Sequence, residues 1–188
     1  MAANRNHPQH PVEFEKLKEW VKDCDSILEI GARYGTNLVG MARAMKGKRV
    51  VSVDWPDKEG WNDPGVGNVL RANVKMLESE GYDATLIIGD SHSVDVFERV
   101  LLLGPFDLVF IDGDHSYSGV KQDWEWYGPL GKTVIFHDIM RPHKNSNPGL
   151  EVWKLWNEIK VSRETEEFIA PDSPMGLGRV RTPAIQQS

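Results

Sequence analysis

Hydrophobic and polar positions follow two different periods along the chain. Short runs rich in β-branched residues alternate with stretches in which apolar residues recur every three or four positions. The first pattern is typical of strands and the second of amphipathic helices. Strands are predicted at 26–31, 48–54, 84–90, 106–112 and 132–138, with two more within 165–181, and helices at 12–23, 35–47, 67–80, 93–104, 118–130 and 150–160.

The alternation of strands with helices predicts the fold class. Helical connections between strands favour right-handed crossovers and a parallel sheet covered on both faces. The last two strands are too close in sequence for such a crossover and predict an antiparallel hairpin. We therefore expect an α/β fold: a Rossmann-like, doubly wound, mostly parallel seven-stranded sheet with a C-terminal antiparallel hairpin. The 188 residues predict one domain at 12–181 between disordered tails at 1–11 and 182–188.

Polar groups follow the predicted parallel strands. In an open parallel sheet, ligands bind beyond the carboxyl ends of the strands, so these groups are expected to line one cleft. They are Glu29 with Gly31, Asp54, Asp90, Asp112, and His137 with Asp138.

The stretch EIGARYGTN at 29–37 is a glycine-rich turn that leads from a strand into a helix. Gly31 and Gly35 serve either tight packing or ligand contact, and the helix N-terminus could receive a carboxylate. The G-x-G-x-x-G pattern of pyrophosphate binding is absent. Asp54 is placed to bind ribose hydroxyls. Asp90 either contacts an adenine or precedes a helix capped by Ser91.

A second group of polar residues follows the fourth and fifth strands, which are expected to be neighbours. Asp112 would then meet His137 and Asp138, and clustered carboxylates repel one another unless a cation lies between them. A divalent metal is expected, magnesium or manganese first, although an imidazole ligand also suits iron or zinc. Alternatively, His137 is only hydrogen-bonded at its strand end. His115 is a candidate base or a residue of the next helix start, and Asp114 orients it or is an outer ligand.

The motifs LEIGARYGTN, VVSVD, LIIGDS, LVFIDGDHSYSGVKQDW and VIFHD, in this order, resemble those of class I S-adenosylmethionine (SAM)-dependent methyltransferases. More narrowly, they are similar to the metal-dependent O-methyltransferases of the sugar and antibiotic branch, which includes the macrocin- and cephalosporin-biosynthesis enzymes. The resemblance covers residues 26–181. It implies that Glu29, Gly31 and Gly35 border the methionine end of SAM, Asp54 the ribose, and Asp90 with Ser91 the adenine.

The same resemblance implies a metal-assisted reaction. Asp112 and Asp138 match metal-binding carboxylates, whereas His137 replaces a third ligand that is usually Asp or Glu. His115 matches the position of the catalytic base, and Asp112 is counted among the catalytic and cofactor-contacting residues as well. The expected function is SAM-dependent, divalent-metal-assisted methyl transfer to a hydroxyl of a small molecule or sugar.

Two other functions remain open from the sequence. A nicotinamide-dependent oxidoreductase uses the same type of sheet, but the missing G-x-G-x-x-G and the terminal hairpin count against it. A non-catalytic binding module with the SAM fold is disfavoured because no packing requirement explains so many polar groups at one place. These are Asp112, Asp114, His115, His137 and Asp138.

Composition limits the classes of binding partner and the compartment that are expected. The formal net charge of −6 provides no basic footprint for nucleic acid, and no apolar run is long enough to span a membrane. The opening MAANRNHPQHP does not resemble a signal peptide, and the single Cys24 fits a reducing compartment, so a cytoplasmic protein is expected. Little of the chain is left for a substrate domain. This favours an open site, a large acceptor or a lid from a second subunit, so a homo-oligomer is one expectation.

Overall fold

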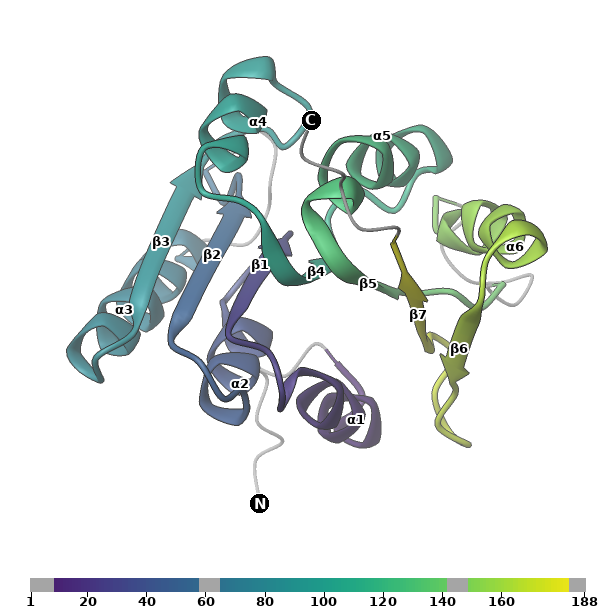
Figure 1. The fold of residues 1–188 in the computed structure, drawn as a ribbon, viewed down its shortest axis with the longest axis horizontal. Helices are drawn as coiled ribbons and strands as arrows, with labels where there is room; N and C mark the ends of the chain where they lie inside the picture. Colours follow the sequence, from purple (N-terminus) through teal and green to yellow (C-terminus); the bar gives the residue numbers. More distant parts are fainter. Residues whose placement is uncertain (1–8, 58–64, 142–148, 183–188) are drawn as a thin grey trace.

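The computed structural model describes residues 9–57, 65–141 and 149–182 (Figure 1). Within these residues, seven strands alternate with six α-helices, except at the C-terminal hairpin. The strands are β1 (Ser26–Ile30), β2 (Arg49–Asp54), β3 (Asp83–Ile88), β4 (Phe106–Ile111), β5 (Gly131–His137), β6 (Thr165–Phe168) and β7 (Leu177–Arg181). The helices are α1 (Pro11–Val21), α2 (Thr36–Ala44), α3 (Val66–Ser79), α4 (Val94–Leu101), α5 (Tyr117–Tyr127) and α6 (Val152–Ser162).

The strands form one sheet with the order β3-β2-β1-β4-β5-β7-β6. Strands β1 to β5 are parallel, while β7 pairs antiparallel with both β5 and β6. The predicted fold class is therefore confirmed, including the hairpin. The order reverses between β1 and β4, and this switch point is where a parallel sheet opens a ligand crevice.

Helices cover both faces of the sheet (Figure 1). On one face, α4, α5 and α6 pack on alternate strand residues such as Leu28 and Phe136. On the other face, α1, α2 and α3 pack on residues such as Ile27 and Ile135. Because side chains alternate along a strand, Glu29 and His137 are directed toward the face covered by α1 to α3.

Some element boundaries differ from the prediction. Helix α5 ends at Tyr127, and a short 3₁₀ turn, Gly128–Leu130, follows it around Pro129, because proline cannot continue an α-helix. Pro11, assigned to the N-terminal tail, is the first residue of α1, and Gln9 is buried. Residues 1–8 and 183–188 of the predicted tails lie outside the described residues. Among the helices that the structure describes, none is both long and apolar enough to cross a membrane.

Candidate functional site at the carboxyl ends of the strands

A cleft with a volume of about 720 Å³ opens at the carboxyl ends of the parallel strands. Its walls come from the ends of β1 to β5, the first turn of α2 and the loop before β7. The predicted residues on its walls are Gly31, Asp54, Asp90, Ser91, Asp112, Asp114, His115, His137 and Asp138. Glu29 and Gly35 lie behind the wall, Glu29 as a fully buried side chain and Gly35 as the residue that precedes α2.

The glycine turn depends on two left-handed residues. Gly31 has a φ of +87°, and a Cβ atom there would lie 2.4 Å from the carbonyl oxygen of Asp112. Gly35 has a φ of +76° and, lacking a side chain, leaves the N-terminus of α2 without a side-chain cap. The Asp54 carboxylate closes the turn by accepting the Arg33 N–H at 2.6 Å and the Ala32 N–H. The sequence left open whether Gly31 serves tight packing or ligand contact. The close approach of Gly31 to the end of β4 shows that packing requires a glycine at this position.

Replacement of Gly31 by alanine is expected to destabilise the fold by about 2–5 kcal/mol, because strain at positive φ adds to a clash with backbone. The matched control is Gly81→Ala, since Gly81 has a φ of +85° and a Cβ atom there would meet no described atom within 4 Å. That control should lose only about 1–2 kcal/mol. Urea unfolding of both variants measures the difference in the free energy of unfolding. Equal losses in the two variants would show that the close approach to Asp112 does not contribute to the cost at Gly31.

Buried polar groups without partners lie behind the glycine turn. Glu29 has no exposed surface, and neither of its carboxylate oxygens has a hydrogen-bond partner among the described residues. The Oδ1 of Asn37 and the Oγ of Ser52 are likewise unpaired within the described part of the chain. Ser52 is directly beside Glu29 on the neighbouring strand. Burial raises the pKa of Glu29 well above its usual value, and the charges of Asp112 and Asp54 add to the effect.

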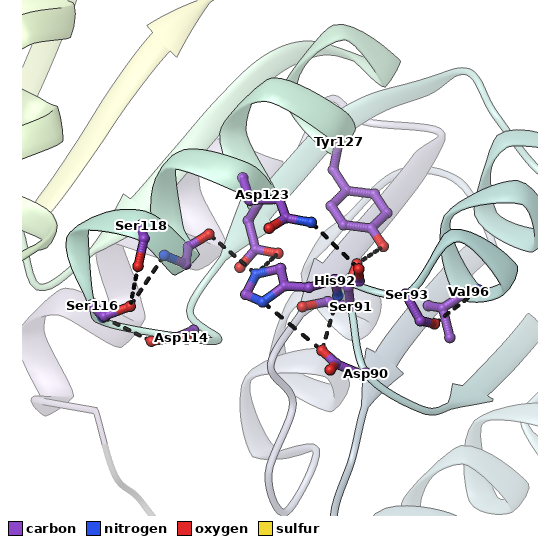
Figure 2. Close-up of polar contacts among 12 residues, drawn as sticks. Asp90, Ser91, His92, Ser93, Val96, Asp114, Ser116, Ser118, Asp123 and Tyr127 are labelled. Carbon is purple, nitrogen blue, oxygen red and sulfur yellow. Dashed lines mark hydrogen bonds and ion pairs between the residues drawn. The ribbon is translucent and has the colours of Figure 1, made fainter.

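A polar network closes the far end of the cleft, after β3 (Figure 2). His92 lies between two carboxylates: its Nε2 is 3.1 Å from Oδ1 of the fully buried Asp123, and its Nδ1 is 3.9 Å from Asp90 Oδ1. Asp90 also accepts the His92 N–H, and the hydroxyl of Tyr127 donates to the Ser91 carbonyl at 2.6 Å. A hydrogen bond with Asp123 raises the pKa of His92 despite its burial.

This network resolves the alternatives for Ser91. The residue that caps α4 is Ser93, whose hydroxyl accepts the Val96 N–H. Ser91 instead lines the cleft and is held by its backbone to α5. Capping is therefore excluded as the role of Ser91, while adenine contact by Asp90 and Ser91 stays a prediction.

Three ionisable side chains meet where β4 and β5 end. One ligand atom each from Asp112, His115 and Asp138 lie within 4.8 Å of one another. His115 Nε2 is 3.3 Å from Asp112 Oδ1 and 3.1 Å from Asp138 Oδ2. Asp138 has a φ of +59°, which aspartate tolerates better than most residues, and its Oδ1 is buried with no hydrogen-bond partner among the described residues.

His137, the third predicted ligand, is not one of these three residues, although its Nδ1 lies 3.8 Å from Asp138 Oδ1. Its Nδ1 contacts Asp112 Oδ1 at 2.9 Å, and its Nε2 faces Glu13 Oε2 of α1 at 3.6 Å. Within the described residues, the structure thus gathers Asp112, Asp138 and His115, rather than His137, around the candidate metal position. Metal binding itself stays a prediction.

The acidic and imidazole groups of the cluster shift one another's pKa values. Burial would lower the pKa of His115, but hydrogen bonds and charges of Asp112 and Asp138 raise it to about 10. Burial would raise the pKa of Asp112, but His137 and His115 hold it well below its usual range. The two imidazoles therefore stabilise the ionised form of Asp112.

The backbone around His115 is fixed independently of its ring. Its carbonyl accepts the Glu151 N–H at 2.7 Å, and the Glu151 carboxylate accepts the Tyr117 N–H. Helix α5 is capped by Ser116, whose own N–H donates to Asp114. His115 has no part in this cap, so the alternative of a helix-start histidine is wrong, and Asp114 shapes the loop rather than bonding to the imidazole of His115.

Sequence reasoning did not single out Glu13, His92 or Asp123. Glu13 and Asp123 had a signal, since each is an acid at a helix position that the apolar period assigns to the core. Glu13 precedes Leu17, Trp20 and Val21 on one buried helix face. His92 had no comparable signal, because its role depends on α5 packing across the loop after β3.

Comparisons with known proteins agree with this architecture. A family model described as a methyltransferase domain matches residues 28–139. The O-methyltransferase from Bacillus cereus, solved with SAH, superposes with a TM-score of 0.69 at 19% identity, covering 94% of this chain and 84% of that one. The O-methyltransferase TomG from Streptomyces achromogenes, solved with SAM, gives 0.65 at 14% identity, covering 92% and 80%.

A curated relative matches a shorter segment. The uncharacterized protein y4gI of Sinorhizobium fredii is 38% identical over 66 residues, which are 33% of this chain and 7% of that protein. The chain thus corresponds to a small part of this relative's length. The family match, in contrast, spans more than half of the chain and includes the glycine turn and the ends of β1 to β5. The chain belongs to the methyltransferase domain family.

Proposed function

We propose that this protein is a SAM-dependent O-methyltransferase, assisted by a divalent cation, that acts on a hydroxyl of a small molecule or sugar. The observation that carries the proposal is Glu29, a fully buried carboxyl without a partner among the described residues, behind a glycine turn that opens into the cleft. Leaving such a group unpaired is costly. A cationic ligand group at this end of the cleft would compensate for it.

The residues present fit SAM. SAM supplies a methyl group on a sulfonium and also carries an ammonium, a carboxylate and a ribose diol. Glu29 and Asn37 offer unpaired oxygens near the glycine turn, as far as the described residues go. The N-terminus of α2, where Gly35 provides no side-chain cap, suits a carboxylate. Asp54 uses Oδ2 for the Arg33 N–H and lines the cleft, so it is available to a ribose. A nicotinamide dinucleotide would instead need a pyrophosphate-binding loop.

The residues at the other end fit a divalent cation. Asp112 and Asp138 provide carboxylate oxygens close together, one of them buried and unpaired within the described residues, as magnesium and manganese prefer. Such a cation supplies a Lewis acid that lowers the pKa of an acceptor hydroxyl. We assign Asp112 and Asp138 to holding it, with His115 beside them.

His115 is the proposed base. Its Nε2 is directed toward the two carboxylates, and the charges of these carboxylates are what hold a proton on the ring. A cation bound by Asp112 and Asp138 would neutralise their charge and lower the pKa of the imidazole. The imidazole could then accept the proton of an acceptor hydroxyl as the oxygen attacks the methyl group. A small-molecule acceptor is supported by the similarity to TomG, which is involved in tomaymycin synthesis. A sugar acceptor is supported by the motif DGDHSY, which resembles that of the sugar branch.

Calorimetric titration of the EDTA-treated protein tests this proposal. SAM is expected to bind with a Kd in the micromolar range, NAD is expected to give no heat, and Mn²⁺ is expected to give a separate isotherm that Asp138→Asn abolishes. A protein that binds NAD instead of SAM would support the oxidoreductase. A protein that binds neither would support the non-catalytic module, and both results would contradict the proposal.

A further inference from the structure

Helix α1 sends one acidic side chain into the interior. Glu13 is fully buried on the face of α1 that also carries Leu17 and Val21. Its Oε1 accepts the Gly176 N–H, immediately before β7, at 2.8 Å. Its Oε2 is directed at His137. Glu13 therefore connects the first helix to the end of β5 and to the hairpin loop, both of which are far from it in sequence.

His137 lies between two carboxylates from different elements. Its ring is 6% exposed, with Nδ1 2.9 Å from Asp112 Oδ1 and Nε2 3.6 Å from Glu13 Oε2. Among the described residues, neither His137 Nε2 nor Glu13 Oε2 has a hydrogen-bond partner. These two buried atoms face each other at 3.6 Å, just beyond hydrogen-bond distance. On its other side the ring approaches both carboxylates of the candidate metal position, since Nδ1 also lies 3.8 Å from Asp138 Oδ1.

The orientation of Asp112 depends on this arrangement. Its Oδ1 is contacted by His137 from the side of α1 and by His115 from the side of the cleft. A carboxylate held by an imidazole on its buried side cannot rotate freely, and carboxylates that bind metals are commonly held by such outer groups. The Glu13 carboxylate behind the imidazole restrains the position of the ring.

We infer that Glu13 is a positioning residue, which acts through His137 to hold Asp112 in the orientation that the candidate cation site requires. The inference rests on the proposed function and goes beyond it, because it gives the N-terminal helix a part in the site. It also explains a histidine at the end of β5, where the resemblance leads one to expect a carboxylate ligand. His137 then supports a ligand instead of being one.

Manganese titration of the full chain tests the inference. Glu13→Gln keeps the size of the side chain and an oxygen for the Gly176 N–H but removes the charge that faces His137. We expect the Kd for Mn²⁺ to rise about 10-fold or more, while the Kd for SAM stays within about 2-fold, since Glu29, Gly31 and Asp54 are not in this chain of contacts. Glu15→Gln is the matched control, because Glu15 is exposed on the same helix and pairs with Lys18.

A double-mutant cycle separates positioning from mere packing of α1. If Glu13 acts through His137, Glu13→Gln should cause no further loss of Mn²⁺ affinity in a His137→Gln protein. The same 10-fold loss in both backgrounds would overturn the inference, as would Mn²⁺ binding by Glu13→Gln equal to wild type. A parallel loss of SAM and Mn²⁺ affinity with a lower Tm would show a structural role only and would also overturn it.

The wild-type titrations keep the two proposals distinguishable. Wild-type protein that binds Mn²⁺ and SAM, with an unaffected Glu13→Gln variant, leaves the proposed function standing and overturns the inference alone. Wild-type protein that binds SAM but no Mn²⁺ overturns the inference and the metal part of the proposed function. Wild-type protein that binds neither overturns both.

Discussion

Replacement of His115 by glutamine is expected to lower the kcat of methyl transfer by about 10²–10⁴-fold, which is the usual contribution of a positioned base. Glutamine approximates the size of the ring but cannot accept a proton at neutral pH. The loop should keep its shape, because it is anchored by backbone hydrogen bonds to Glu151 and by the Ser116 cap rather than by the imidazole. Single-turnover kinetics with a hydroxyl acceptor measure the effect.

Two binding measurements define what this loss means. With His115 as the base, the Kd values for SAM and Mn²⁺ should change little in His115→Gln while kcat falls. A large loss of Mn²⁺ affinity would instead make His115 a metal ligand, an assignment that its distances to Asp112 and Asp138 permit. Full activity in the variant would remove His115 from the mechanism altogether.

Replacement of Glu29 by glutamine is expected to weaken SAM binding by about 30-fold or more, since removing one partner of a buried charge pair typically costs 2–5 kcal/mol. The charge that disappears is the one proposed to face a cationic group of SAM. Calorimetry gives the Kd, and Glu98→Gln on the exposed side of α4 is the matched control. Unchanged SAM affinity in Glu29→Gln would remove the observation on which the proposed function rests.

The same variant should have the opposite effect on the ligand-free protein. Burial raises the pKa of Glu29 in the folded state above its ordinary value of 4.5. Above pH 4.5 the unfolded chain therefore binds fewer protons at this site than the folded chain, and stability falls as the pH rises. Glu29→Gln removes this dependence, so its Tm should exceed that of wild type at pH 8, with the difference shrinking toward pH 4.5. Saturating SAM should reverse the order of the two Tm values.

A buried ionisable group that destabilises the free protein and strengthens ligand binding is typical of functional sites. Glu29 shows why the resemblance and the structure are both needed. The sequence places an acid at the end of a strand, and only packing by α2 and β2 shows that the described residues around it provide no partner.

The fold followed from the sequence because it depends on local patterns. Strand and helix periods, the glycine turn and the short terminal connection predict the sheet, its parallel and antiparallel parts and the edge at which Asp54, Asp90 and Asp112 gather. Each of these features is decided by residues close together in the chain, or by the rule that parallel strands share one carboxyl edge. The sequence by itself therefore determined the architecture and the site's location.

The partners of individual side chains were decided by tertiary structure alone. The predicted ligand His137 is directed by strand alternation toward α1, where Glu13 lies 124 positions earlier in the sequence, while His115 approaches Asp112 and Asp138 from the loop after β4. In the same way, His92 meets Asp123 only because α5 packs across the loop after β3. Which of several nearby polar groups pair with one another depends on directions and distances of a few ångströms, and residue spacing along the chain does not specify these.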